Sequence, residues 1–203
     1  PALNLLASLR LWAPNVSVAV YNLGDLSQDQ LQQVANQTNV KAVEWWNRVP
    51  NHYPRHLRLT MKYAWKPVII YEALLKYRRI FWVDAGCAFT GPIDQLVNIL
   101  KRQGIFVVQG QDAKMLGHID TFTWFGISSN ESRTFGGPSF AGGIQGHVYP
   151  SRYFDTVVRP NALCALDENC IAPQGVKLGR RHHFDQTDSV QHRNAFVGYH
   201  SGW

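Results

Sequence analysis

Hydrophobic and polar positions along the first 109 residues switch repeatedly between helical and strand spacing. Helices are bounded by their usual end signals: Ser27 and Gln30 form a capping-box pair, and Pro67 and Pro92 suit first turns. The predicted elements are a helix over 3–12, a strand over 16–21, a helix over 27–36, a strand over 40–45, a loop over 47–58, a helix over 66–77, a strand over 80–84, a helix between Pro92 and Gly104, and a strand over 105–108. Such alternation predicts an α/β fold with crossover connections.

One strand in this series is unusually apolar. Residues 80–83 read Ile-Phe-Trp-Val without a break, and Asp84 follows them. A continuous apolar run is typical of a strand that is buried on both faces in a parallel sheet. We therefore expect residues 81–83 to form a central parallel strand, with Asp84 at its exposed carboxyl end.

The second half of the chain has a different composition. Residues 110–146 are rich in Gly, Ser, Thr and aromatic side chains, which favours irregular loops and short strands around a site. Because no internal repeat or low-complexity linker separates the halves, we expect a single domain over 1–203.

Composition and charge narrow the function classes. With 45% hydrophobic and 17% charged residues, the chain is predicted to be a soluble globular domain, and its apolar runs are far too short to span a membrane. The net charge of +6 suits an anionic ligand. Because the basic residues stand in short clusters, such as Arg180-Arg181, we expect no nucleic acid partner.

The cysteines and the glycosylation sequons point to the secretory pathway. Cys164 and Cys170 bracket a segment short enough for one disulfide, whereas Cys87 stands in an apolar stretch as a free thiol; two unpaired thiols are the alternative for the pair. Three Asn-x-Ser/Thr sequons begin at Asn15, Asn36 and Asn130. Together these features favour an oxidising compartment.

The carboxyl end of a strand in an open α/β sheet is where ligands bind. A carboxylate there, such as Asp84, can hold a divalent metal ion that in turn binds a diphosphate. A helix-capping or purely structural aspartate is the alternative.

Three segments together resemble a known family. They are Tyr63-Ala-Trp-Lys-Pro-Val-Ile-Ile-Tyr-Glu-Ala-Leu, Phe81-Trp-Val-Asp-Ala-Gly-Cys-Ala-Phe89, and Cys170-Ile-Ala-Pro-Gln-Gly175 followed by Arg181-His-His-Phe-Asp-Gln186. They resemble a eukaryotic group of glycosyltransferase-like proteins with the GT-A fold, and more distantly glycosyltransferase family 8. The resemblance spans roughly residues 3–193.

The resemblance implies a fold, with one departure from the pattern. It implies a mostly parallel, Rossmann-like sheet flanked by helices, whose first strand is missing from this chain, with a nucleotide-binding half over about 1–109 and an acceptor-side half over about 110–203. GT-A enzymes usually have an Asp-x-Asp element that binds Mn²⁺ or Mg²⁺. Here the triplet is Asp84-Ala85-Gly86, so the second carboxylate is absent.

The resemblance also implies site residues. The metal ligands would be Asp84 and His200, the latter in Tyr199-His-Ser-Gly-Trp203, which is similar to a family 8 ending. The "D-Q" element, Asp185-Gln186, would be catalytic, acting on the acceptor hydroxyl or the donor sugar; an N-cap for a following helix is the alternative. The donor-binding residues would be Asp84, Gly86, Gly142, Gly143, Arg181 and His183. Gly-rich turns without a ligand and a solvated basic cluster remain open.

Taken together, these features predict a glycosyltransferase of the secretory pathway, in the Golgi lumen. It would move a sugar from a nucleotide-sugar donor to a hydroxyl of a glycan or glycoprotein, and would meet a membrane only through a segment absent from this chain. The alternative is a catalytically silent relative that serves as a binding or assembly module, favoured by Gly86, by Ala141 in place of a sugar-binding Asn, and by the missing strand.

Overall fold

The computed structural model describes residues 1–45, 52–112, 117–134 and 138–173. In chain order the elements are α1 (Ala2–Trp12), β1 (Val18–Asn22), α2 (Gln28–Ala35), β2 (Val40–Trp45), η2 (Arg55–Arg58), η3 (Thr60–Lys62), α3 (Trp65–Tyr77), β3 (Arg79–Val83), α4 (Asp94–Gln103), β4 (Ile105–Asp112), α6 (Ile119–Trp124), α7 (Ser129–Thr134), β5 (Pro138–Val148), η4 (Phe154–Val158), α8 (Arg159–Leu166) and α9 (Glu168–Ile171). The mixed α/β class is confirmed, as is the helix and strand order through β4.

Local sequence signals set the helix ends. The Ser27 hydroxyl accepts from the Gln30 amide, and the Gln30 side chain accepts from the Ser27 amide, so the predicted capping box begins α2. Gly104, with φ of 78°, ends α4 in the left-handed conformation that glycine adopts without a steric penalty. Part of the predicted loop over 47–58 lies outside the described residues, and its end forms the short helix η2.

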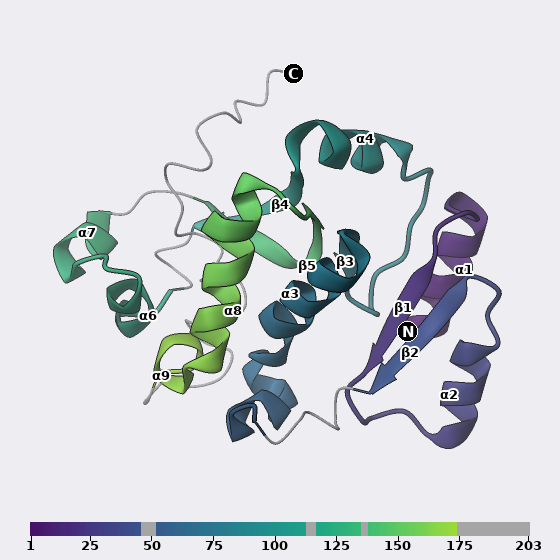
Figure 1. Ribbon diagram of the computed structural model, residues 1–203, viewed down its shortest axis with the longest axis horizontal. Helices are drawn as coiled ribbons and strands as arrows, with labels where there is room; N and C mark the ends of the chain where they lie inside the picture. Colours follow the sequence, from purple (N-terminus) through teal and green to yellow (C-terminus); the bar gives the residue numbers. More distant parts are fainter. Residues whose placement is uncertain (46–51, 113–116, 135–137, 174–203) are drawn as a thin grey trace.

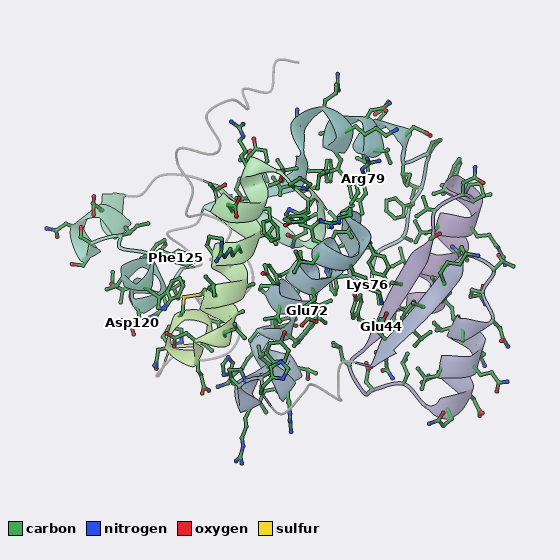
Figure 2. All side chains as sticks on the ribbon, viewed as in Figure 1. Glu44, Glu72, Lys76, Arg79, Asp120 and Phe125 are labelled. Carbon is green, nitrogen blue, oxygen red and sulfur yellow. A yellow bond between two sulfur atoms is a disulfide. The ribbon has the colours of Figure 1, made fainter. Side chains whose placement is uncertain are left out.

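The strands of the described residues form two separate sheets. β1 and β2 are parallel, with α2 as their crossover, as the sequence predicts. β3, β5 and β4 form a second sheet in that order, and both of its pairings are antiparallel. Figure 1 shows α3 between the β1–β2 pair and α8. On α3, the Lys76 ammonium lies 2.6 Å from a Glu44 carboxylate oxygen on β2, a pairing visible in Figure 2.

One sequence prediction about this second sheet is wrong, and a second holds only in part. In the described part of the chain β3 pairs only with β5, in the antiparallel direction, so it is an edge strand whose residues from Ile80 to Val83 are half-buried, and not a central parallel strand. The expectation of loops and short strands in the Gly-rich segment holds in part, because β5 is a strand but extends over 11 residues and pairs on both sides. The sheet is therefore not mostly parallel, and the structure does not establish a GT-A fold.

Glycine in β5 explains part of the apolar character of β3. Gly146 lies directly across from both Phe81 on β3 and Phe106 on β4. Because Gly146 has no side chain, the two phenyl rings meet over it edge to face, with centroids 5.6 Å apart. The apolar run of β3 thus reflects packing on both sides of the strand, with Phe81 over the glycine and Ile80 and Trp82 against buried residues of the helices, not burial between two neighbouring parallel strands.

Several apolar clusters join the helices to the sheets. One of them contains Leu57, Trp65, Ile69 and both disulfide cysteines, with Trp82 packed against it. The bond between Cys164 and Cys170 is present, with Cα atoms 5.2 Å apart, and ties α8 to α9, while Cys87 is a free thiol. Both predictions about the cysteines are confirmed.

We predict that Gly146→Ala destabilises the protein. An added Cβ would lie 2.7 Å from Phe81 Cε1 and 3.2 Å from Phe106 Cβ, so the aromatic pair would have to move. The expected loss in unfolding free energy is about 1–3 kcal/mol, measured by urea denaturation. Gly91→Ala is the matched control because no atom lies within 4 Å of its added Cβ. Equal stability of the two variants would contradict the packing described here.

Candidate functional site

Asp84 is held by the backbone at the point where β3 ends. Its amide donates to the Gly143 carbonyl on β5 at 2.9 Å, and its own carbonyl accepts from the Cys87 amide at 2.9 Å. The side chain is 39% exposed. Its position beyond the carboxyl end of the strand agrees with the sequence prediction, although that strand is antiparallel to its neighbour.

A buried lysine is the ionic partner of Asp84. Lys66 stands in the first turn of α3, and its side chain is only 3% exposed. Its ammonium lies 3.1 Å from Asp84 Oδ2 and 3.4 Å from the Gly142 carbonyl oxygen. A charge so deeply buried requires an opposite charge and hydrogen-bond acceptors nearby, and these two groups supply them.

Aromatic rings surround this ion pair. The Trp82 indole donates to Asp84 Oδ1 at 2.7 Å, so each carboxylate oxygen accepts one N–H group. The rings of Tyr63, Trp65 and Trp82 have centroids 5.6–6.0 Å from the Lys66 ammonium. Ring faces at that distance attract a cation, so they further stabilise the charge of Lys66.

Sequence reasoning missed Lys66 as a site residue. The sequence pattern assigns Lys66-Pro67 to the start of a helix and to a segment that resembles the glycosyltransferase-like group, without a role in a site. The available signal was a single cation in a stretch, Trp65–Ile70, whose other members are apolar and whose helix is buried. A lysine among such neighbours needs a counter-charge, and the carboxylate after the adjacent strand is the natural candidate.

The glycines of β5 lie against the carboxylate. A Cβ on Gly143 would lie 3.6 Å from Asp84 Oδ2, so only hydrogen occupies that face now. Gly142 is buried and accepts from Lys66. Gly86 follows in the exposed turn, with no atom within 4 Å of a Cβ placed there. The structure therefore brings Asp84, Gly142 and Gly143 together. Gly86 lies in the turn that follows, with open space around it.

The described residues near Asp84 do not fit a divalent metal ion. No group of three or more His, Cys, Asp or Glu side chains suited to a metal occurs in the described part of the chain. Both oxygens of Asp84 already accept N–H groups, and an added cation would meet the Lys66 ammonium. At a protein surface, two unit charges 4 Å apart interact by about 4 kcal/mol, and a divalent ion doubles this repulsion.

The other predicted site residues lie outside the described residues. They are Arg181, His183, Asp185, Gln186 and His200. Their proximity to Asp84, and the N-cap alternative for Asp185, stay predictions.

A small cavity is lined in part by Lys66. Its volume is about 20 Å³, enough for a single water molecule. The lining residues are Lys66, Pro67, Ile70, Gln145, His147, Val157, Val158 and Asn161. His147 is 2% exposed, and its Nε2 lies 2.8 Å from the Gln145 side-chain oxygen, so Nε2 bears the hydrogen. Of the polar atoms of the residues that line this cavity, His147 Nδ1 and Asn161 Oδ1 are buried and have no hydrogen-bond partner among the described residues.

Comparison with protein-family models, curated proteins and solved structures finds no match for this chain. In the described ranges, no helix combines the length and the apolar character needed to cross a bilayer. The Cys164–Cys170 bond is compatible with a secreted protein. Asn15, Asn36 and Asn130, which begin the three sequons, are all exposed.

We predict that Asp84→Asn destabilises the protein more than Lys66→Met. The first variant leaves a buried ammonium without its counter-charge, whereas the second leaves a carboxylate that water can reach and adds an apolar side chain among aromatic rings. Because Asp84 is partly exposed, the expected loss for Asp84→Asn is about 1–3 kcal/mol, against less than about 1 kcal/mol for Lys66→Met.

Urea denaturation measures both effects, together with the double variant. The double variant should be more stable than Asp84→Asn alone, because it removes the unpaired charge. Asp25→Asn, in the exposed loop before α2, controls for loss of a carboxylate. Equal losses for the two single variants would show that the pair is not asymmetrically buried.

We predict a stability loss in mild acid that depends on His147. Burial lowers the pKa of His147 from 6.5 to about 4. Between these values the unfolded chain binds a proton that the native protein does not, so unfolding free energy falls as pH falls from about 6.5 to 4. The total loss of unfolding free energy from this one group is about 3 kcal/mol. His147→Gln should remove this component, seen as a shallower pH dependence in urea denaturation between pH 4 and 7. Parallel pH profiles for the two proteins would contradict the prediction.

Proposed function

We propose that the protein is a glycosyltransferase that moves a sugar from a nucleotide-sugar donor to a hydroxyl of a glycan or glycoprotein. The observation that supports it most directly is Asp84 beside the Gly142-Gly143 backbone. A partly exposed carboxylate at the end of a strand, next to a chain segment without side chains, leaves room for a ligand to approach the backbone. The donor's diphosphate would lie on this face.

The chemistry is divided between two groups of residues. Asp185 would accept a proton from the acceptor hydroxyl, or orient the donor sugar, and Gln186 would assist it. Arg181 and His183 would donate to the diphosphate as it leaves. These roles rest on the resemblance to GT-A enzymes.

A second candidate function is a catalytically silent binding or assembly module. The observation that favours it is the Lys66–Asp84 pair, because the carboxylate expected to serve the donor is already neutralised within the protein. The two functions differ in one measurable respect, since only the transferase requires nucleotide affinity.

The proposal also places the protein in the Golgi lumen. The buried disulfide supports an oxidising compartment, and the exposed sequon asparagines are accessible to the glycosylation machinery.

We predict that Gly143→Ala weakens nucleotide binding without loss of stability. The added methyl group would be in ordinary contact with Asp84 Oδ2 at 3.6 Å, so the fold accommodates it, but it fills the face that a diphosphate would occupy. Calorimetry with UDP and GDP should show affinity reduced by about tenfold or more, equal to 1.4 kcal/mol. Gly91→Ala, with open space around its added Cβ, should bind as the unmodified chain does.

Two outcomes would count against the proposal, the first against transfer itself and the second against the place given to the diphosphate. If neither nucleotide binds the unmodified protein, the silent module is favoured. If Gly143→Ala binds as well as the unmodified chain, the diphosphate does not lie at Asp84. Once binding is established, Asp185→Asn should reduce transfer by about 10²-fold or more and leave nucleotide affinity nearly unchanged.

A further inference from the structure

The carboxylate of Asp84 already has a cation beside it, and that cation is part of the chain. We propose that the Lys66 ammonium takes the place of a divalent metal ion at Asp84, so that nucleotide binding does not require a metal. The inference rests on the proposed function for its nucleotide, but its claim about the metal can be tested without one.

The positive charge is fixed in position. The Lys66 ammonium contacts Asp84 Oδ2 and the Gly142 carbonyl oxygen, and three aromatic rings lie within 6.0 Å of it. Its side chain is 3% exposed and starts from the first turn of a buried helix. It is therefore a positioned charge, unlike a mobile surface lysine.

Such a charge answers a requirement of diphosphate binding. A bare carboxylate at Asp84 would repel a diphosphate, and a metal ion normally reverses that repulsion. With Lys66 at 3.1 Å, the net charge of the pair is zero, so a diphosphate can approach along Gly143. Because Lys66 is buried, it acts through Asp84 and is a positioning residue rather than a contact residue.

The same geometry predicts what happens when the lysine is removed. In Lys66→Met, Asp84 loses the donor on Oδ2, and a divalent cation can occupy the space the ammonium leaves. Removing the lysine should thus create a metal dependence that the unmodified protein lacks. If Lys66 had only a structural role, its removal would not create a metal dependence.

The first experiment titrates the full chain with Mn²⁺ alone and follows free Mn²⁺ by electron paramagnetic resonance. The unmodified protein should show no Mn²⁺ site that Asp84→Asn abolishes. Lys66→Met should gain a weak site, and Lys66→Met/Asp84→Asn should lose it again. A Mn²⁺ site in the unmodified protein that disappears in Asp84→Asn would overturn the inference.

The second experiment measures UDP binding by calorimetry, with either Mn²⁺ or EDTA present. The unmodified protein should bind equally in both, within about twofold, whereas Lys66→Met should bind about tenfold more weakly in EDTA and recover with Mn²⁺. Lys62→Met is the matched control, because Lys62 pairs with Glu168 and not with Asp84. Thermal unfolding verifies that each variant is folded.

The results separate the two proposals. If the unmodified protein binds UDP only with Mn²⁺, the inference is wrong and the proposed function stands. If it binds no nucleotide in either buffer, the proposed function fails, and the Mn²⁺ titration still decides whether Lys66 excludes a metal from Asp84. Both tests on the unmodified protein remain decisive even if Lys66→Met does not fold.

Discussion

A buried ammonium group determines much of the arrangement around the site. Lys66 enters the interior at the start of α3, so a carboxylate must reach it from another element. Asp84 can do so because its amide is bonded to Gly143, which fixes the end of β3 against β5. One ion pair thus joins a helix and two strands that are distant in sequence, and its geometry requires all three to be correctly placed.

Glycine residues occur on both faces of β5, and the lack of a side chain has a different effect on each face. Alternate residues of a strand point to opposite faces, so Gly143, Gln145 and His147 share one face, next to Asp84 and the cavity. Gly146 points to the other, where Phe81 and Phe106 close over it. The absence of a side chain therefore leaves open space beside Asp84 on one face and allows aromatic packing on the other.

Features that depend on residues close together in the sequence were predicted correctly, whereas the pairing of distant strands was not. The α2 capping box, the Gly104 helix end and the Cys164–Cys170 bond depend on residues fewer than ten positions apart, and all were predicted correctly. The pairing of β3 with β5 joins residues more than sixty positions apart. An apolar run fits either a parallel strand between two neighbours or an edge strand packed over glycine, so periodicity alone could not separate them.

The candidate site shows the same division between local and distant information. Asp84 was found because a carboxylate after an apolar strand is visible in the sequence, whereas its partner Lys66 depends on a tertiary contact. That partner changes the electrostatic requirement of the proposed donor site. Since the Lys66–Asp84 pair is neutral overall, it removes a repulsion but does not balance the charge of a diphosphate. The remaining positive charge must come from elsewhere in a chain whose net charge is +6, and Arg181 and His183 are the residues that the resemblance offers for it. The proposed function therefore needs both parts: a neutral, rigid contact at Asp84 and further positive charge for the phosphates.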